Sequence, residues 1–127
     1  MRCLMIVKGT DKSEAGCMPS LELITEMGKF NDEMKAAGVM VDGTGLKPSS
    51  KAARVVFDDA GKPSVIDGPF AETKELISGF WVIDVKSLDE AISWAKRIPQ
   101  LNGQGPRNIE IRPYFEPEDF AYLAEQK

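Results

Sequence analysis

The amino-acid sequence predicts an α+β domain, and three observations support that prediction. Two amphipathic helical patterns alternate with strand-like apolar runs, and two further β-prone runs flank a short Asp/Gly connection. The third observation is the length of 127 residues, which suits one domain. A chain of this size buries about two-thirds of its unfolded surface, enough for one core without disulfides or metal. We expect a single domain over residues 1–127, with residues 116–127 as an acidic tail.

The first half of the chain predicts a strand, a helix and a second strand. Residues 2–8 are apolar on both faces of a strand, which is typical of a central position in a sheet. Residues 9–19 are predicted as a loop. A helix is expected from Ser20, whose hydroxyl can cap free N–H groups, to Gly38, which tolerates the left-handed terminal conformation. Its apolar stripe comprises Leu23, Met27, Phe30, Met34 and Ala37, and a short strand over 39–41 follows.

The middle of the chain predicts a β-hairpin and a long strand. Residues 53–57 and 63–67 are β-prone runs around an Asp/Gly-containing connection. Residues 67–70 are predicted as a turn, and the segment 71–77 is left without an assigned conformation. Residues 80–85 form the clearest strand of the sequence.

A second helix and a last strand close the predicted domain. Ser87 and Glu90 form a capping box, in which Glu90 is expected to reach back to the capping residue. The apolar face of this helix comprises Leu88, Ala91, Ile92, Ala95 and Ile98, and Pro99 ends it. Residues 109–112 read as the last strand, and the tail predicts a short helix through Phe120, Tyr122 and Leu123.

This order is that of a ferredoxin-like βαββαβ fold with an inserted β-hairpin. Both helices are amphipathic, so they are expected to cover one face of the sheet. The other face is also apolar, because Val82 points away from its neighbours Trp81 and Ile83. An uncovered apolar sheet face usually marks an interface, and pairing two such faces around a two-fold axis covers both. We therefore expect a homodimer.

Composition excludes several classes of function. The chain contains no histidine, so no mechanism can use imidazole as a base, acid or metal ligand. A net charge of −4 argues against nucleic-acid binding. No apolar run is long enough to span a membrane, and residues 1–8 lack a secretory signal, so a cytoplasmic protein is expected. We expect neither a cofactor nor a metal. Cys3 is expected as a buried small hydrophobe, and Cys17 as an exposed loop residue with a redox role as the lesser alternative.

Several motifs, in order along the chain, resemble the YCII-related family in its DGPF-domain branch. The central one is Asp67-Gly68-Pro69-Phe70, which continues as Ala-Glu-Thr-Lys-Glu. The others are Ile77-Ser-Gly-Phe-Trp-Val-Ile83, Ser87-Leu-Asp-Glu-Ala91, Ala36-Ala-Gly-Val39, Gly43-Thr-Gly-Leu-Lys-Pro-Ser49 and Glu110-Ile-Arg-Pro113. The resemblance covers nearly the whole chain except the acidic tail.

The resemblance implies a homodimeric α+β barrel in which the sheets of two subunits face one another. It implies less about function, because the family is largely uncharacterised. Some relatives in the wider group are lyase-like enzymes that act on chlorinated ring-fission products with a His–Asp pair. That mechanism cannot be carried over to a chain without histidine. Genes of the DGPF branch often neighbour those of extracytoplasmic-function sigma factors, which implies a regulatory role.

The candidate site residues lie at the DGPF motif and on the hairpin. Asp67 can accept hydrogen bonds from its own turn while Phe70 anchors the turn by packing. Alternatively, Asp67, Glu72, Lys74 and Glu75 lie at the mouth of a cleft between the sheet and the hairpin, where Asp67 or Glu72 could act as a general base. Arg54 is either an edge charge or, together with Phe70 and Lys74, part of a binding site for an anion.

The residues leave three functions open. The first is a small-molecule-binding module for a small organic acid, serving regulation. The second is a cofactor-independent lyase- or isomerase-like enzyme on a small organic acid, with Asp67 or Glu72 as its base. The third is a partner in protein interaction alone. Arg112, like Arg54, either carries an edge charge or points to an anionic ligand. The sequence does not decide whether the protein is an enzyme.

Overall fold

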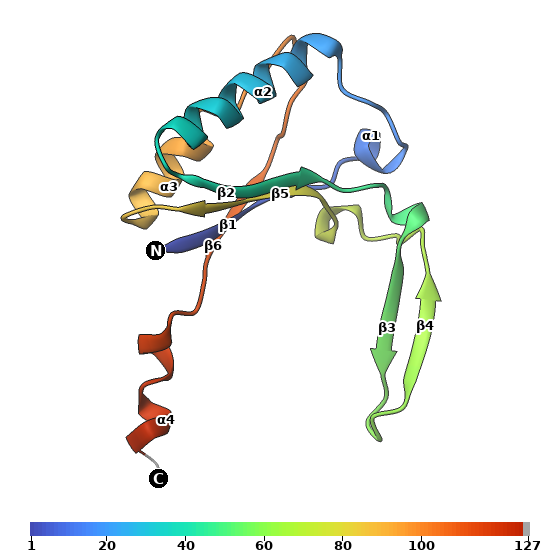
Figure 1. Cartoon of the computed structure of the whole chain (residues 1–127). Helices are drawn as coiled ribbons and strands as arrows, with labels where there is room; N and C mark the ends of the chain where they lie inside the picture. Colours follow the sequence, from blue (N-terminus) through green and yellow to red (C-terminus); the bar gives the residue numbers. More distant parts are fainter. Residues whose placement is uncertain (126–127) are drawn as a thin grey trace.

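The chain forms a four-stranded antiparallel sheet and a separate hairpin in a computed structural model (Figure 1). The structure describes residues 1–125, except for the side chains of Lys74 and Glu125. The sheet has the order β2-β5-β1-β6, and its strands are β1 (Arg2–Lys8), β2 (Met40–Gly45), β5 (Ile77–Asp84) and β6 (Ile109–Pro113). β3 (Ala53–Phe57) and β4 (Pro63–Asp67) pair only with each other. This arrangement confirms the predicted ferredoxin-like α+β fold.

Two helices, α2 (Leu21–Ala36) and α3 (Leu88–Ala95), lie over the same face of the sheet (Figure 1). The Ser20 hydroxyl caps α2 by accepting a hydrogen bond from the Leu23 N–H at 3.2 Å, as predicted. The core between helices and sheet consists of Cys3, Met5, Phe30, Met34, Val39, Trp81, Ile83, Val85, Ala91 and Ile98. The apolar stripe of α2 therefore faces the sheet.

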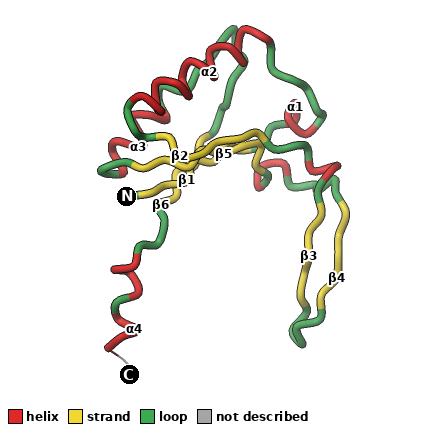
Figure 2. The backbone as a smooth tube through the Cα atoms, in the orientation of Figure 1, coloured by secondary structure: helices red, strands yellow, loops and turns green. Residues whose placement is uncertain are grey.

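Two segments extend away from the sheet on the side that the helices leave uncovered (Figures 1 and 2). The first is the β3–β4 hairpin, residues 53–67, which we call the hairpin arm. The second is the C-terminal arm, residues 114–125, which contains the short helices η3 (Pro117–Phe120) and α4 (Tyr122–Glu125). The predicted short helix of the tail is thus present as two turns.

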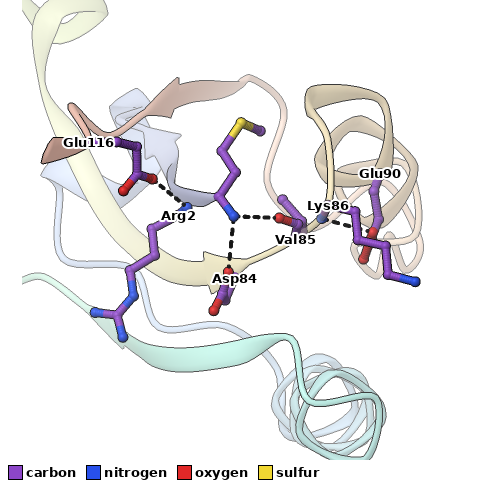
Figure 3. A network of polar contacts seen from close by, with 7 residues as sticks. Arg2, Asp84, Val85, Lys86, Glu90 and Glu116 are labelled. Atoms are coloured by element: carbon purple, nitrogen blue, oxygen red, sulfur yellow. Dashed lines mark hydrogen bonds and ion pairs between the residues drawn. The ribbon is translucent and has the colours of Figure 1, made fainter. Parts of the chain in front are cut away.

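Hydrogen bonds fix the root of the C-terminal arm to the start of β1 (Figure 3). The Arg2 N–H donates to the Glu116 carboxylate at 3.3 Å. The Tyr114 N–H donates to the Arg2 carbonyl at 2.9 Å. Beside them, the Met1 amino group donates to the Asp84 carboxylate at 3.3 Å and to the Val85 carbonyl at 2.8 Å. The arm therefore leaves the sheet in a defined direction.

Local structure differs from the sequence prediction at the ends of elements. β2 continues to Gly45 because it pairs with β5 as far as Gly79, and β5 begins at Ile77 because it pairs with β1 as far as Lys8. The Glu90 carboxylate accepts from the Lys86 N–H at 3.1 Å rather than from the capping residue Ser87 (Figure 3). Ser87 itself caps α3 as predicted, since its hydroxyl accepts from the Glu90 N–H at 3.1 Å.

The predicted loop over 9–19 was wrong in one part, because it contains the short helix α1 (Asp11–Glu14). Thr10 and Ser13 cap this helix reciprocally, each side chain accepting a hydrogen bond from the backbone N–H of the other. Serine is not the residue usually expected at the third helical position of a capping box, so the pattern is easily missed.

Candidate functional site

The DGPF turn is held against the connection between β2 and β3. That connection contains η1 (Ser49–Lys51), and Ser49 is buried, with 6% of its surface exposed. The Ser49 hydroxyl accepts a hydrogen bond from the Phe70 N–H at 3.0 Å. The Gly68 N–H donates to the Ala52 carbonyl at 3.0 Å. One hydrogen bond to the Ser49 hydroxyl and one to the Ala52 carbonyl thus tie the turn to η1 and the residue after it, at the root of the hairpin arm.

Glu14, from α1, completes this anchor. Its carboxylate accepts from the Ser49 N–H at 3.0 Å and from the Ser49 hydroxyl. Three segments far apart in the sequence therefore meet at one buried serine, and hydrogen bonds to a charged acceptor are among the stronger ones in proteins. The sequence analysis did not single out Glu14. The capping pair at Thr10 and Ser13 was the signal that could have placed Glu14 at the end of a helix.

Gly68 is required by the closeness of two backbone segments. A Cβ atom at this position would lie 1.6 Å from the Ser49 carbonyl oxygen, which is backbone and cannot move aside easily. Steric crowding, independent of the backbone angles, therefore explains why this position of the DGPF motif is a glycine. The Gly68–Pro69 peptide bond is cis.

Arg54, Phe70 and Glu72 come together at the root of the hairpin arm. The Arg54 guanidinium carbon lies 3.8 Å from the centroid of the Phe70 ring, a stacked cation–π geometry. The nearest Glu72 carboxylate oxygen lies 3.8 Å from an Arg54 nitrogen, beyond hydrogen-bond distance. The two side chains form an ion pair in which the Arg54 donors stay open to a further acceptor.

Asp67 lies next to this group without joining it. It is exposed at the end of β4, where its backbone is opposite Ala53. Among the described residues, the hydrogen bonds of the turn go to Ser49 and Ala52, and none goes to the Asp67 carboxylate. The self-bonded Asp turn occurs instead at Asp58, whose carboxylate accepts from the Ala60 and Lys62 N–H groups at 2.9 and 2.8 Å.

The side chain of Lys74 is not among the described parts of the chain, and Arg112 lies outside the group. Arg112 lies on β6, where it pairs with Glu110 at 3.3 Å and is opposite Leu4 in the sheet. The structure therefore brings together two of the predicted ligand-binding residues, Arg54 and Phe70, and one predicted base, Glu72.

The open face of the sheet has an apolar centre. Leu4 is opposite Val82, and Ile6 is opposite Phe80, with all four side chains half-buried. Polar and charged residues flank this centre on the two outer strands: Asp42 and Thr44 on β2, and Glu110 and Arg112 on β6. Along β1 and β5, the apolar residues of this centre alternate with apolar residues of the core, so both faces of the central strands are apolar, as predicted.

A family model for the YCII-related domain matches residues 1–116. The chain belongs to the YCII-related family. Another comparison finds 44% identity over 68 residues to the uncharacterised protein R00369 of Rhizobium meliloti (strain 1021). That match spans 54% of this chain and 53% of the relative, so it covers about half the length of either protein.

Two shallow hollows of this YCII-related domain lie away from the DGPF turn. Their volumes are about 290 and 390 Å³, and both are lined by residues of α2 and by Leu101. Neither is lined by a residue of the group around Arg54. Within the described residues, no cluster of three Cys, Asp or Glu side chains could hold a metal ion, and no helix is long and apolar enough to cross a membrane.

Proposed function

We propose that this protein is a homodimeric binding module for a small organic acid, with Arg54 as the residue that holds the carboxylate. The observation that carries the proposal is the stacking of Arg54 on Phe70. A planar guanidinium that is fixed on an aromatic ring presents its edge donors in a defined direction. A carboxylate can accept two parallel hydrogen bonds from such an edge.

The environment of Arg54 supports binding from solution. Its side chain is 42% exposed, and Glu72 is too far away to accept a hydrogen bond from it. Among the described residues, no hydrogen bond uses a donor of the Arg54 side chain. A ligand carboxylate would therefore meet donors that are already oriented and need no partner to be displaced.

The exposed area supports the dimer. The chain exposes 9016 Å², whereas a compact monomer of 14.0 kDa exposes about 6,700 Å². The excess of about 2,300 Å² per chain is of the size that an obligate homodimer buries on each subunit. The surplus consists in part of the two arms and the open face, which carry large apolar side chains. A second copy would cover them.

The wider setting of the proposal follows from the DGPF motif and the two thiols. Association with extracytoplasmic-function sigma factors, implied by the DGPF branch, gives the module a regulatory role. Cys3 and Cys17 are both free, which suits a reducing, cytoplasmic compartment. Ligand binding in that compartment would then report the level of an organic acid.

The alternative is a lyase- or isomerase-like enzyme with a carboxylate base. In one copy, both Asp67 and Glu72 are exposed to solvent, and Glu72 is paired with Arg54. A general base needs a fixed position within hydrogen-bond reach of its proton. The enzyme hypothesis thus requires a partner or substrate to enclose these carboxylates. The binding hypothesis requires only the observed position of Arg54.

A thermal-shift screen against small carboxylic acids tests the proposal. A ligand at about a hundred times its dissociation constant stabilises the folded state by about 2.7 kcal/mol. We expect Arg54→Gln to abolish the shift. Arg97→Gln is the matched control, because Arg97 also stacks on an aromatic ring, Trp94 at 4.5 Å, and pairs with a glutamate, Glu33.

Two results would contradict binding at Arg54. One is the absence of any carboxylate hit, and the other is a hit that survives Arg54→Gln unchanged. If a hit is also turned over, Asp67→Asn and Glu72→Gln decide between the two readings. Loss of turnover with retained binding in either variant would establish the enzyme in place of the module.

A further inference from the structure

The two arms leave the sheet at opposite ends of its strands. Residues 68–76 lead from the hairpin arm to Ile77, the first residue of β5. The C-terminal arm leaves β6 at Pro113, which is opposite Cys3, and Cys3 is opposite Ile83 near the last residue of β5. Both arms point to the uncovered side of the sheet (Figure 1). The two arms therefore lie on either side of the open face.

Both arms carry large apolar side chains that the described part of the same chain leaves exposed over 40% or more of their surface. In the hairpin arm, five such residues are 44–66% exposed: Val55, Val56, Phe57, Val65 and Ile66. In the C-terminal arm, five are 40–79% exposed: Tyr114, Phe115, Phe120, Tyr122 and Leu123. An isolated two-stranded hairpin is at best marginally stable in water. The arms therefore need an apolar partner.

We propose that the hairpin arm of each copy packs against the C-terminal arm of its partner, so that the binding site at Arg54 is completed by the second copy. The inference rests on the dimer of the proposed function. When two open faces meet, the two-fold axis lies between the sheets. An axis across the strands exchanges their ends and brings unlike arms together, whereas an axis along the strands brings like arms together.

Charge favours the pairing of unlike arms. Residues 114–125 contain four carboxylates, Glu116, Glu118, Asp119 and Glu125, and no cationic side chain. Two C-terminal arms in contact would bring eight carboxylates together at close range, which is unfavourable. The hairpin arm carries both signs, with Arg54 and Lys62 among its three aspartates. Of the two arms, only the hairpin arm therefore offers cations to a C-terminal arm.

This pairing places the partner's chain beside the candidate site. Each arm starts at its own sheet and extends toward the other copy, so paired arms run in opposite directions. The free end of the partner's C-terminal arm then reaches the root of the hairpin, where Arg54 stacks on Phe70. Apolar groups from the partner would shield the Arg54 edge from water and strengthen its bond to a carboxylate.

Cross-linking between variants that each carry one exposed cysteine tests which arms meet. The background is the full chain with Cys17→Ser; Cys3 can remain, since burial raises the pKa of its thiol and hides it from reagents. Val65→Cys labels the hairpin arm and Ala121→Cys the C-terminal arm, both at exposed positions. The two variants are mixed, co-refolded and treated with a flexible bis-maleimide. Sedimentation measures the oligomeric state in parallel.

We expect a covalent dimer in the mixture of the two variants and little in either variant alone. Glu22→Cys on α2 mixed with Ala121→Cys is the control, since α2 lies over the opposite face of the sheet. Ser64→Cys with Leu123→Cys provides a second pair if one variant fails to fold.

The outcomes separate this inference from the dimer itself. A dimer in which Val65→Cys cross-links with itself overturns the pairing of unlike arms and leaves the dimer intact. A dimer without cross-links, or with as much product in the α2 control, also overturns it. A monomer at all concentrations overturns both the dimer and the pairing. Loss of the ligand shift in a dimer that lacks residues 114–127 would further support a site completed by the partner.

Discussion

The two faces of the four-stranded sheet have similar chemistry but different surroundings. On one face, Met5 and Ile83 are completely buried beneath the helices α2 and α3. On the other face, their neighbours Leu4 and Val82 are only half-buried. The two arms extend on this side of the sheet, and no helix of the described chain covers it. An apolar residue has the same tendency to leave water on either face. The proposed dimer accounts for this difference, because a second copy would supply the layer that covers the open face.

Adjacent residues of β1 give the largest expected effect and the sharpest test of this contrast. Met5→Ala removes a fully buried side chain and should lower the free energy of unfolding by about 4 kcal/mol at every protein concentration. Leu4→Ala should cost little in dilute protein and progressively more as the dimer forms. Denaturant unfolding over about a hundredfold range of concentration measures both.

The proposed difference between the two faces would be contradicted if Leu4→Ala lowered the free energy of unfolding by the same amount at all protein concentrations. Leu4 would then be covered by its own chain, and the open face would not be an interface. Sedimentation of the same variant provides an independent check, because a weaker interface raises the dissociation constant of the dimer.

A pair of glycines tests the anchor of the hairpin arm. Gly68→Ala should destabilise the protein by about 3 kcal/mol, since the added Cβ would lie 1.6 Å from the Ser49 carbonyl oxygen. Gly28→Ala is the matched control in the interior of α2, with nothing within 4 Å, and should stabilise by about 0.5–1 kcal/mol. Urea unfolding of the two variants should therefore shift in opposite directions. Equal shifts would show that the DGPF turn adapts to a side chain.

A pair of serines gives the smallest effect. Ser49→Ala removes the hydroxyl that bonds Glu14 and the Phe70 N–H, and it should cost about 2 kcal/mol. Ser50→Ala, the exposed neighbour, should be neutral within about 0.5 kcal/mol. Thermal unfolding distinguishes the two. A neutral Ser49→Ala would mean that the hairpin arm is positioned by contacts other than this serine.

The sequence predicted those parts of the fold that depend on local patterns. β-prone runs around an Asp/Gly connection gave both strands of the hairpin with their observed bounds, and Ser20 and Ser87 marked the starts of the two long helices. Strand ends were less predictable, because pairing with β5 extends β2 and pairing with β1 extends β5 beyond their own apolar residues.

The site was predictable in its members and not in its contacts. The motif drew attention to Asp67, Phe70 and Glu72, but no pattern shows that a guanidinium on β3 stacks on the ring. The bond between Glu14 and Ser49 joins residues 35 positions apart and forms only once η1 is folded beside α1. Such contacts depend on how distant elements pack against each other in the folded chain, and local sequence patterns do not specify that packing.

The hairpin arm also has a consequence for handling the protein. Each of its strands has a free outer edge, a row of backbone groups on which strands of other molecules can add. Charges interrupt its apolar runs: Arg54 precedes Val55-Val56-Phe57, and Asp58 and Asp59 follow. Such residues act as gatekeepers against edge-to-edge aggregation. Neutralising the two aspartates should therefore lower the concentration at which the protein remains soluble, even where it leaves the fold unchanged.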